Sequence, residues 1–484
     1  MKLSRRNFVK TAVAASALTM PALSYGRVMG TNDKIRVAVV GLNGRGRKHL
    51  DEMKDNVVAL CDCDQGVLGA AAEPLDVMKF FDYRRLCESN EVDAISIATP
   101  NHTHSLIAIT AMMAGKDVYC EKPVSHNVWE GRQLVECAAR MKRICQSGTQ
   151  SRSSTALQAA VKAVQSGQFG KIQYAIGTCY KPRTSIGKLD KPLVISDKVD
   201  YDLWCGPAEK RELFRPKFHY DWHWDFNTGN GDMGNQGIHQ MDIARWFLGC
   251  DTVSPRVLSI GGRVGYEDAA DTPNSQTVIH DYPNAPLIFE TRGLPKGKEF
   301  QDSKLWRRNM DEYRGSKIGV IVQCENGYVV VSQKYSAATA FDNEGNVIKN
   351  WKGELKPFRN FLDAVEAQDA SLLNAPILEG HISSALCHMG GLSHQLGEKA
   401  TGEEIVAAME SESDWFKDSY ARLARHLKVN GIEIETEKTL TLGASLEFDT
   451  ENETVLNNDK ATPMLSREYR AGFEIPNMQM ESAG

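Results

Sequence analysis

The sequence predicts an α/β fold in two parts: an N-terminal Rossmann domain with a doubly wound parallel sheet, then an α/β domain with a mostly antiparallel sheet. Between residues 35 and 150, short β-branched runs alternate with helix-like segments, which is typical of a parallel sheet with crossover helices. From about Ser151 the pattern changes. The later runs that look like antiparallel strands are Val257–Ile260, Gln276–His280, Leu287–Thr291, Gly319–Cys324 and Tyr328–Ser332.

The composition excludes several classes of protein. The 484 residues are 42% hydrophobic and 25% charged, with a formal net charge of -5. No basic stripe indicates a nucleic-acid partner. After the N-terminus no segment has the roughly 18 unbroken apolar residues of a membrane span, so we expect no stable span in the mature protein. The 11 cysteines follow no zinc spacing, and we expect buried thiols.

Residues 1–30 predict a twin-arginine signal peptide. The run Ser4-Arg5-Arg6-Asn7-Phe8-Val9-Lys10 fills every position of the S-R-R-x-F-x-K pattern, and a modest apolar stretch, Thr11–Leu23, follows it. The alternative is the basic start of an ordinary secretory signal. We therefore expect a periplasmic or otherwise exported protein; cleavage near residues 24–26 and an uncleaved anchor both stay open.

A glycine-rich turn follows the first predicted strand, Ile35–Val40. It reads Gly41-Leu42-Asn43-Gly44-Arg45-Gly46, and residues 47–54 then look helical. Such a turn brings backbone N–H groups and the positive end of a helix close to a pyrophosphate. The G-x-G-x-x-G fingerprint is imperfect, because Asn43 stands at the second glycine position and Gly44 comes one residue later.

Asp62 strengthens this dinucleotide site. It ends the second strand, Val57–Asp62, twenty-one positions after Gly41, where an acid would bind the adenosine ribose hydroxyls. The carboxylate disfavours a 2′-phosphate, so we expect NAD rather than NADP. The alternative for Asp62 is a helix N-cap or turn residue.

Two more strands complete the predicted domain, residues 31–150. Asp93–Thr99 ends in the turn Pro100–His104, and Asp117–Cys120 ends in Glu121-Lys122-Pro123. Ligands of such sheets bind beyond the carboxyl ends of the strands, where both turns lie. The expected cofactor-binding residues are Gly41, Asn43, Gly44, Arg45, Gly46, Asp62, Thr99, Pro100, Asn101, His104, Glu121 and Lys122.

These motifs, with others downstream, resemble the Gfo/Idh/MocA family, the group of glucose–fructose oxidoreductase and myo-inositol dehydrogenase. The similarity covers about residues 34–395. The segments that carry it are Thr99-Pro100-Asn101-x-x-His104, Glu121–Pro123, Gly148-Thr149-Gln150-x-Arg152, Tyr201–Pro207 and Gly231–Asp242. The resemblance implies a second domain, residues 151–445, whose open sheet faces away from the cofactor and often builds homo-oligomers. Residues 446–484 are expected to form an extended C-terminal arm.

The resemblance also implies the catalytic residues. It places Lys122 beside the nicotinamide and the substrate hydroxyl, where an ammonium donates to the reacting oxygen and relays its proton. His239 matches the family histidine. Asn235 stands where the family usually has Asp, and an amide cannot accept a proton. We expect His239 to act alone as the base, or to be oriented by Asp242 at i+3.

An aromatic segment, Phe218–Asn227, has the residue types that bind sugars. Aromatic faces cover C–H patches of a sugar, and imidazoles and carboxylates bind its hydroxyls. Histidine and aspartate would also suit a metal, but their spacing fits no standard site, and we predict no metal. The expected substrate residues are Tyr180, Arg183, His219, Trp222, His223, Asp225 and Asp242.

Together these features predict an exported, NAD-dependent oxidoreductase that acts on a ring hydroxyl of a sugar or glycoside, for example at C3. NAD is expected to be scarce outside the cytoplasm, so the cofactor should be bound before export and held tightly. A second hypothesis is a redox-neutral NAD-dependent glycosidase of the same superfamily. A third, from another class, is a noncatalytic sugar-binding protein that has kept the fold.

Overall fold

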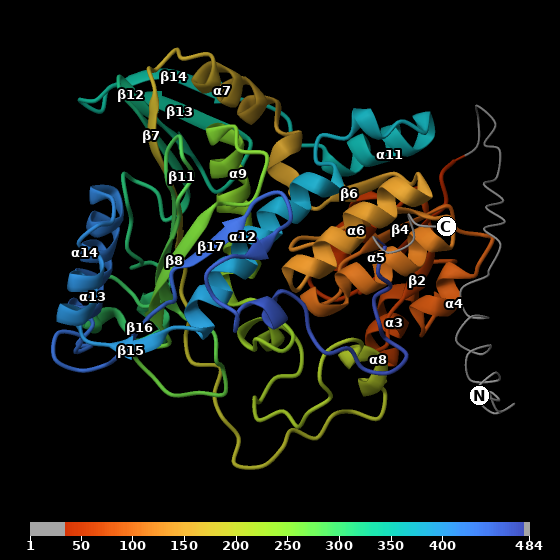
Figure 1. Cartoon of the computed structure of the whole chain (residues 1–484). Helices are drawn as coiled ribbons and strands as arrows, with labels where there is room; N and C mark the ends of the chain where they lie inside the picture. The colour runs from red at the N-terminus through yellow and green to blue at the C-terminus, as the bar shows by residue number, and fades with distance from the viewer. Residues whose placement is uncertain (1–33, 479–484) are drawn as a thin grey trace, which may run out of the picture.

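The computed structural model describes residues 34–478 (Figure 1). The predicted signal peptide therefore lies outside the described residues. The described chain forms two sheets, each with its own helices, and a cavity between them. No helix within residues 34–478 is long and apolar enough to cross a membrane.

The first sheet is parallel throughout and has the order β3-β2-β1-β4-β5-β6. Its strands are β1 (Val37–Val40), β2 (Val57–Cys61), β3 (Met78–Phe80), β4 (Ala94–Ile97), β5 (Asp117–Cys120) and β6 (Cys145–Ser147). Its helices are α2 (Arg45–Glu52), α3 (Gln65–Ala72), α4 (Tyr83–Cys87), α5 (His104–Met113) and α6 (Val128–Met141). From β1 the strands are added first on one side, as β2 and β3, and then on the other side, as β4, β5 and β6. Such folds bind ligands at this switch point between β1 and β4. The predicted doubly wound sheet is confirmed.

The second sheet is mixed and mostly antiparallel, as predicted. Its main path is β14-β13-β12-β11-β7-β10-β9-β8-β16-β15, in which only β7 and β10 pair in parallel. The strands are β7 (Ile172–Tyr180), β8 (Arg256–Gly262), β9 (Ser275–His280), β10 (Leu287–Arg292), β11 (Ile318–Cys324), β12 (Gly327–Val331), β13 (Ala337–Phe341), β14 (Val347–Lys352), β15 (Glu398–Ala400) and β16 (Leu440–Leu442). β17 (Leu446–Asp449) and β18 (Thr454–Val455) extend it beside β8.

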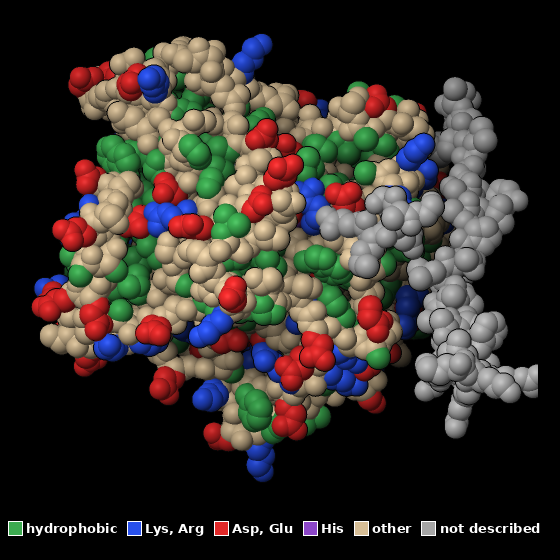
Figure 2. All heavy atoms as spheres, in the orientation of Figure 1, with side chains coloured by type: hydrophobic (Ala, Val, Ile, Leu, Met, Phe, Trp, Pro, Cys, Tyr) green, Lys and Arg blue, Asp and Glu red, His purple; other side chains and the backbone are tan. Residues whose placement is uncertain are grey.

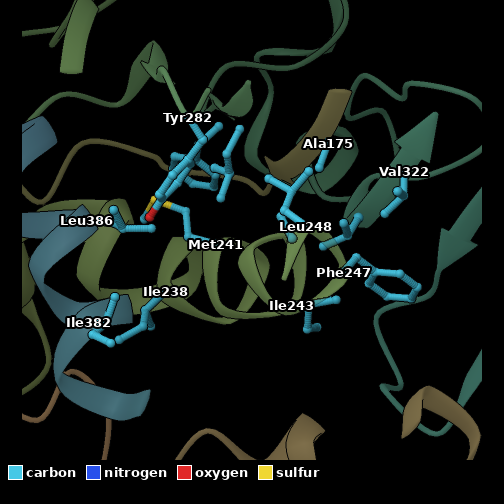
Figure 3. Close-up of a cluster of buried hydrophobic side chains, with 14 of the residues drawn as sticks. Ala175, Ile238, Met241, Ile243, Phe247, Leu248, Tyr282, Val322, Ile382 and Leu386 are labelled. Carbon is cyan, nitrogen blue, oxygen red and sulfur yellow. The ribbon is translucent and has the colours of Figure 1, made fainter. Parts of the chain in front are cut away.

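The inner face of this sheet is covered by helices that link it to the Rossmann domain. They are α7 (Thr155–Gln165), α9 (Ile238–Leu248) and α12 (Ile377–Gln395), while α11 (Pro357–Ala367) packs on the Rossmann domain. Figure 3 shows α9 at the centre of this core, with Phe247 and Met241 among side chains of β7, β11 and α12. Burying a side chain as large as Phe247 stabilises the fold by about 1.5–3 kcal/mol. The core therefore fixes α9, whose first turn carries His239.

The outer face of the second sheet is not bare. α13 (Gly402–Ala408) and α14 (Asp414–Val429) pack there, on the left of Figure 1. Phe416 and Leu423 of α14 are fully buried in one cluster with Ile176 and Ile288 of the sheet. The chain itself thus covers part of the outer face of this sheet.

Residues 446–478 cross back from the second sheet to the Rossmann domain. Between β17 and β18, Glu453 accepts hydrogen bonds from Arg132 of α6 and lies 2.8 Å from His381 of α12. The last described residues bury Phe473 and Ile475 against the Rossmann core.

On the face drawn in Figure 2, acidic and basic side chains of the described residues are interspersed, without a large patch of one sign.

Candidate active site

A cavity of about 580 Å³ lies at the carboxyl ends of β1, β2, β4 and β5, with the second domain as its other wall. Most of the predicted site residues line it. From the predicted cofactor set these are Gly41, Asn43, Gly44, Arg45, Asp62, Thr99, Pro100, Asn101, His104, Glu121 and Lys122. From the predicted catalytic and substrate sets they are Asn235, His239, His219, Trp222 and His223.

The glycine-rich turn is shaped for close backbone packing. A Cβ added to Gly46 would lie 1.7 Å from the carbonyl oxygen of Gly41, and one added to Gly41 would lie 2.8 Å from the backbone of Ala98. Gly44 has φ +47, and nothing lies within 4 Å of an added Cβ there. Gly46 is therefore a packing residue behind the cavity, whereas Gly44 borders open space. These features fit a dinucleotide, whose pyrophosphate needs close approach to the turn.

Asp62 directly follows β2, and its carboxylate braces the glycine-rich turn. Its Oδ2 accepts from the N–H of Leu42 at 2.9 Å and its Oδ1 from the N–H of Asp64 at 2.9 Å. Burial raises the pKa of Asp62. Asp64 lies 3.0 Å from Nε2 of His219, a residue of the second domain. The predicted substrate residue His219 thus borders the end of the cavity at which Asp62 and Asp64 lie.

Glu121 is a buried carboxylate at the centre of a polar network. Its Oε1 accepts from Nε of Arg45 at 2.7 Å and Nε2 of Gln150 at 3.0 Å, and lies 3.1 Å from Nε2 of His49. Burial alone would raise the pKa of Glu121, but the Arg45 guanidinium and His49 hold it well below its usual range. Neither His49 nor Gln150 was expected in the site from its sequence context.

Lys122 extends from this network into the cavity. Its Nζ donates to the backbone carbonyl of Asn235 at 2.5 Å. Burial lowers the pKa of Lys122 to about 8, against the effect of Glu121, which raises it. Asn235 lies in a π-helical turn, Met233–Gly237 (η4), and such turns free carbonyl groups from the helical ladder. The contact between Asn235 and Lys122 is thus made by the main chain of Asn235 and not by its side chain.

Two residues that line the cavity each have a buried polar atom without a hydrogen-bond partner among the described residues: Nδ2 of Asn235 and Nδ1 of His239. Burial, helped by the charge of Lys122, lowers the pKa of His239 well below its usual range, so its imidazole is neutral. Unpartnered buried groups are costly unless a ligand satisfies them. Tyr335, which the sequence analysis missed, lies against the His239 ring with centroids 5.4 Å apart.

Four predicted substrate residues do not line the cavity. The Tyr180 hydroxyl donates to Glu290 at 2.5 Å among the outer-face cluster, because successive strand side chains alternate between faces. Arg183 is partly buried, forms an ion pair with Asp232 and lies over the Trp224 ring at 4.5 Å. These two predictions are corrected by the structure.

Asp225 and Asp242 are likewise engaged away from the cavity. Asp225 pairs with Arg211 and Arg215. Asp242 is fully buried and accepts from Nε of Arg152 and from Oγ of Ser383, both at 2.8 Å. Because a buried carboxylate needs a charged partner, Asp242 serves this ion pair rather than orienting His239. The expected Asp242–His239 arrangement is therefore wrong.

The aromatic segment forms part of the opposite wall. The rings of Trp222 and His223 stack with centroids 3.6 Å apart, and His223 Nδ1 lies 2.5 Å from the carbonyl of Tyr220. Burial lowers the pKa of His223 to about 3. Trp204 also lines the cavity, although the sequence analysis did not single it out. His219, His223 and Asp225 have separate partners and do not converge on one point.

The comparisons with known proteins agree with this geometry. The model of the Gfo/Idh/MocA oxidoreductase family, NAD-binding Rossmann fold, matches residues 35–149, and that of its C-terminal alpha/beta domain matches residues 154–290. An inositol 2-dehydrogenase of Rubrobacter xylanophilus is 31% identical over 29% of this chain and 42% of its own length. A glycosyl hydrolase family 109 protein of Shewanella pealeana is 29% identical over 30% and 39%. The matches thus span about two fifths of these relatives.

Solved structures share the fold at low identity. The WlbA dehydrogenase from Bordetella pertussis, in complex with NADH and UDP-GlcNAcA, is 17% identical, with a TM-score of 0.55 over 75% of this chain and 95% of that one. Levoglucosan dehydrogenase, in complex with NADH, is 16% identical, with a TM-score of 0.54 over 74% and 97%. The two family models together cover more than half of the 484 residues. The chain therefore belongs to the Gfo/Idh/MocA family of oxidoreductases, with an NAD-binding Rossmann domain and the family's C-terminal α/β domain.

Proposed function

We propose that this protein is an exported oxidoreductase that oxidises a ring hydroxyl of a sugar or glycoside with a tightly bound NAD. The observation that carries the proposal is the position of Lys122. Its amine lies in the cavity that the glycine-rich turn borders, beside the neutral His239, and its pKa is lowered by burial to about 8. Such a group can exchange a proton with a hydroxyl near neutral pH.

Lys122, His239 and the aromatic residues have separate roles in the proposed reaction. When bound, a nicotinamide dinucleotide supplies the acceptor for the substrate's hydride. Lys122, anchored by the Asn235 carbonyl, takes the hydroxyl proton when its amine is neutral. His239 is the weaker base, because its pKa is far below that of Lys122, so its imidazole serves to hold and orient the hydroxyl. Trp222 and His223 offer aromatic faces to the sugar ring.

The cofactor specificity is supported by Asp62. Its carboxylate borders the expected ribose end of the cavity and would repel a 2′-phosphate, which favours NAD over NADP. Tight binding and a periplasmic or otherwise exported location rest on the twin-arginine pattern of residues 4–10. We also propose a homo-oligomer, on the family resemblance alone.

A product analysis tests this proposal. The protein is loaded with NAD and mixed with a panel of monosaccharides, disaccharides and glycosides, and the absorbance of reduced nicotinamide is followed through the first turnover. We expect reduction with at least one sugar and, by mass spectrometry, a keto-sugar lighter by two hydrogen atoms. If NADH binds but no sugar is altered across the panel, the protein is a binding protein and the proposal fails.

A redox-neutral glycosidase is the second candidate, favoured by the similarity to the glycosyl hydrolase family 109 protein of Shewanella pealeana. Nitrophenyl glycosides separate the two candidates. Release of nitrophenol with no net change in the cofactor supports the glycosidase, whereas a keto-sugar with reduced cofactor supports the dehydrogenase. We favour the dehydrogenase, because Asn235 does not supply the additional acid that departure of a leaving group requires.

A further inference from the structure

One segment of the second domain forms a wall of the cavity and is here called the cover segment (residues 201–224). It begins with α8 (Tyr201–Cys205) and ends with the 3-10 turn η3 (Asp221–Trp224). Of its residues, Leu203, Trp204, Gly206, His219, Tyr220, Trp222 and His223 line the cavity. Gly41, Asp62 and Lys122 line it from the Rossmann side. A molecule in this cavity is therefore enclosed between the two domains.

The cover segment meets the Rossmann domain at the expected ribose end. Nε2 of His219 lies 3.0 Å from Asp64, two residues after Asp62. Just before the segment, the N–H of Asp200 donates to the carbonyl of Cys63 at 2.9 Å, and the N–H of Gln65 donates to the carbonyl of Lys198 at 2.9 Å. The loop after β2, which carries the ribose acid, is thus covered from the second domain.

The C-terminal arm fastens both ends of the cover segment. Arg470 donates through Nη1 to the carbonyls of Asp202 at 3.1 Å and Gly206 at 3.0 Å, and pairs with the Asp202 carboxylate. Arg467 donates through Nη2 to the carbonyl of Asn227 at 2.9 Å and to its side-chain oxygen at 2.8 Å. Arg470 therefore holds main chain at the start of the segment, and Arg467 holds main chain three residues beyond its end.

The arm is itself anchored on α6 of the Rossmann domain. The hydroxyl of Tyr469 donates to Glu130 at 3.2 Å, and the N–H of Met478 donates to Gln133 at 2.6 Å. Phe473 and Ile475 are each 5% exposed. Figure 1 shows this last stretch, in blue, passing α8 on its way to the Rossmann domain. The cover segment is thus tied by Arg467 and Arg470 to the domain that it faces.

We propose that residues 201–224 close over the bound dinucleotide, with His219 at its adenosine end, and that Arg467 and Arg470 hold this cover shut so that the protein retains its cofactor. The inference rests on the proposed function, in that the cavity takes a nicotinamide dinucleotide. Release then requires the cover segment to lift, which breaks the arginine hydrogen bonds. Hydrogen bonds to charged groups are among the stronger ones, so their loss speeds opening.

The rate of cofactor release tests whether the two arginines hold the cover segment shut. The full chain is loaded with NADH and mixed rapidly with an excess of NAD, and the nicotinamide fluorescence reports dissociation. We expect the double variant Arg467→Gln/Arg470→Gln to release NADH on the order of tenfold faster than the wild type. Glu468→Gln is the matched control, since this exposed side chain lies on the arm between the two arginines, and its release rate should equal that of the wild type.

The partner side of the contact gives an independent variant. Asp202→Asn removes the carboxylate that pairs with Arg470 at a half-exposed position, so it should fold even if the double variant does not. It too should speed release. Unchanged release in a folded double variant, or in Asp202→Asn if the double variant does not fold, overturns the inference. Failure of the wild type to bind NADH overturns instead the proposed function of the cavity.

Discussion

The ionisation of Lys122 offers the sharpest test of the proposed chemistry. Burial lowers its pKa from 10.5 to about 8. At pH 7 about one amine in ten is then neutral, whereas at a pKa of 10.5 only about one in 3,000 would be, a gain of roughly 300-fold in the proton-accepting form. If neutral Lys122 takes the hydroxyl proton, the rate of sugar oxidation rises with pH and levels off above about pH 8.

The assay is the initial rate of oxidation between pH 6 and 10, with a sugar identified from the panel. Lys122→Ala should lower this rate by roughly 10²–10⁴-fold and abolish the rise near pH 8. NADH should still bind, because the glycine-rich turn and Asp62 are untouched. Residual activity that keeps the wild-type rise with pH would show that another group accepts the proton, and loss of NADH binding would make Lys122 a structural residue.

A milder change tests the direction of the shift. The charge of Lys181 also lowers the pKa of Lys122. Lys181→Gln should therefore move the midpoint of the pH profile upward while the maximal rate is retained. A midpoint that moves downward would contradict the assignment of this profile to Lys122.

Three further predictions concern the cofactor turn and the arm. Asp62→Asn removes the charge that opposes a 2′-phosphate, so the ratio of the Kd values for NADPH and NADH, from fluorescence titration, should fall by about tenfold; an unchanged ratio would place the ribose elsewhere. Gly46→Ala should abolish NADH binding, because its Cβ would lie 1.7 Å from a carbonyl oxygen, whereas Gly69→Ala, exposed in α3, should bind normally and raise the free energy of unfolding by about 0.5–1 kcal/mol. Burial raises the pKa of Glu453, but the hydrogen bonds from its histidine and arginine partners outweigh burial and lower it from 4.5 to about 2. The interactions of the ionised Glu453 with these two partners contribute about 3 kcal/mol to the free energy of unfolding above pH 4.5, and this contribution is lost as the pH falls through about 2. The free energies of unfolding of the wild type and of Glu453→Gln, from denaturant titrations, should therefore differ most near neutral pH and converge in acid.

The parts of the site that follow directly from strand ends could be predicted from the sequence. Parallel strands bring their carboxyl ends to one edge, so Gly41, Asp62 and Lys122 were expected together and line one cavity. Tyr180 follows another rule: it lies on a strand whose side chains alternate between two covered faces, and only the packing of α14 shows which face it joins.

The ion pairs could not be predicted, because their partners are distant in the chain. Asp242 is neutralised by Arg152, ninety positions earlier, and Glu121 by Arg45, seventy-six positions earlier. A charged side chain that could act in the site, judged from the sequence, is instead paired with the opposite charge that the fold places beside it. For the same reason the acidic and histidine residues of the aromatic segment do not gather into one site.

The sequence by itself determined the two-part α/β architecture, the family and the glycine-rich turn of the NAD-binding domain, because these depend on local periodicity and on short motifs. Only the tertiary structure decided how Lys122 is held. Its partner is a main-chain carbonyl in a π-helical turn, and its pKa depends on burial between two domains. Tertiary contacts also decided that the C-terminal arm fastens the cover segment, since Arg470 and Asp202 are 268 positions apart in the chain and meet only through folding.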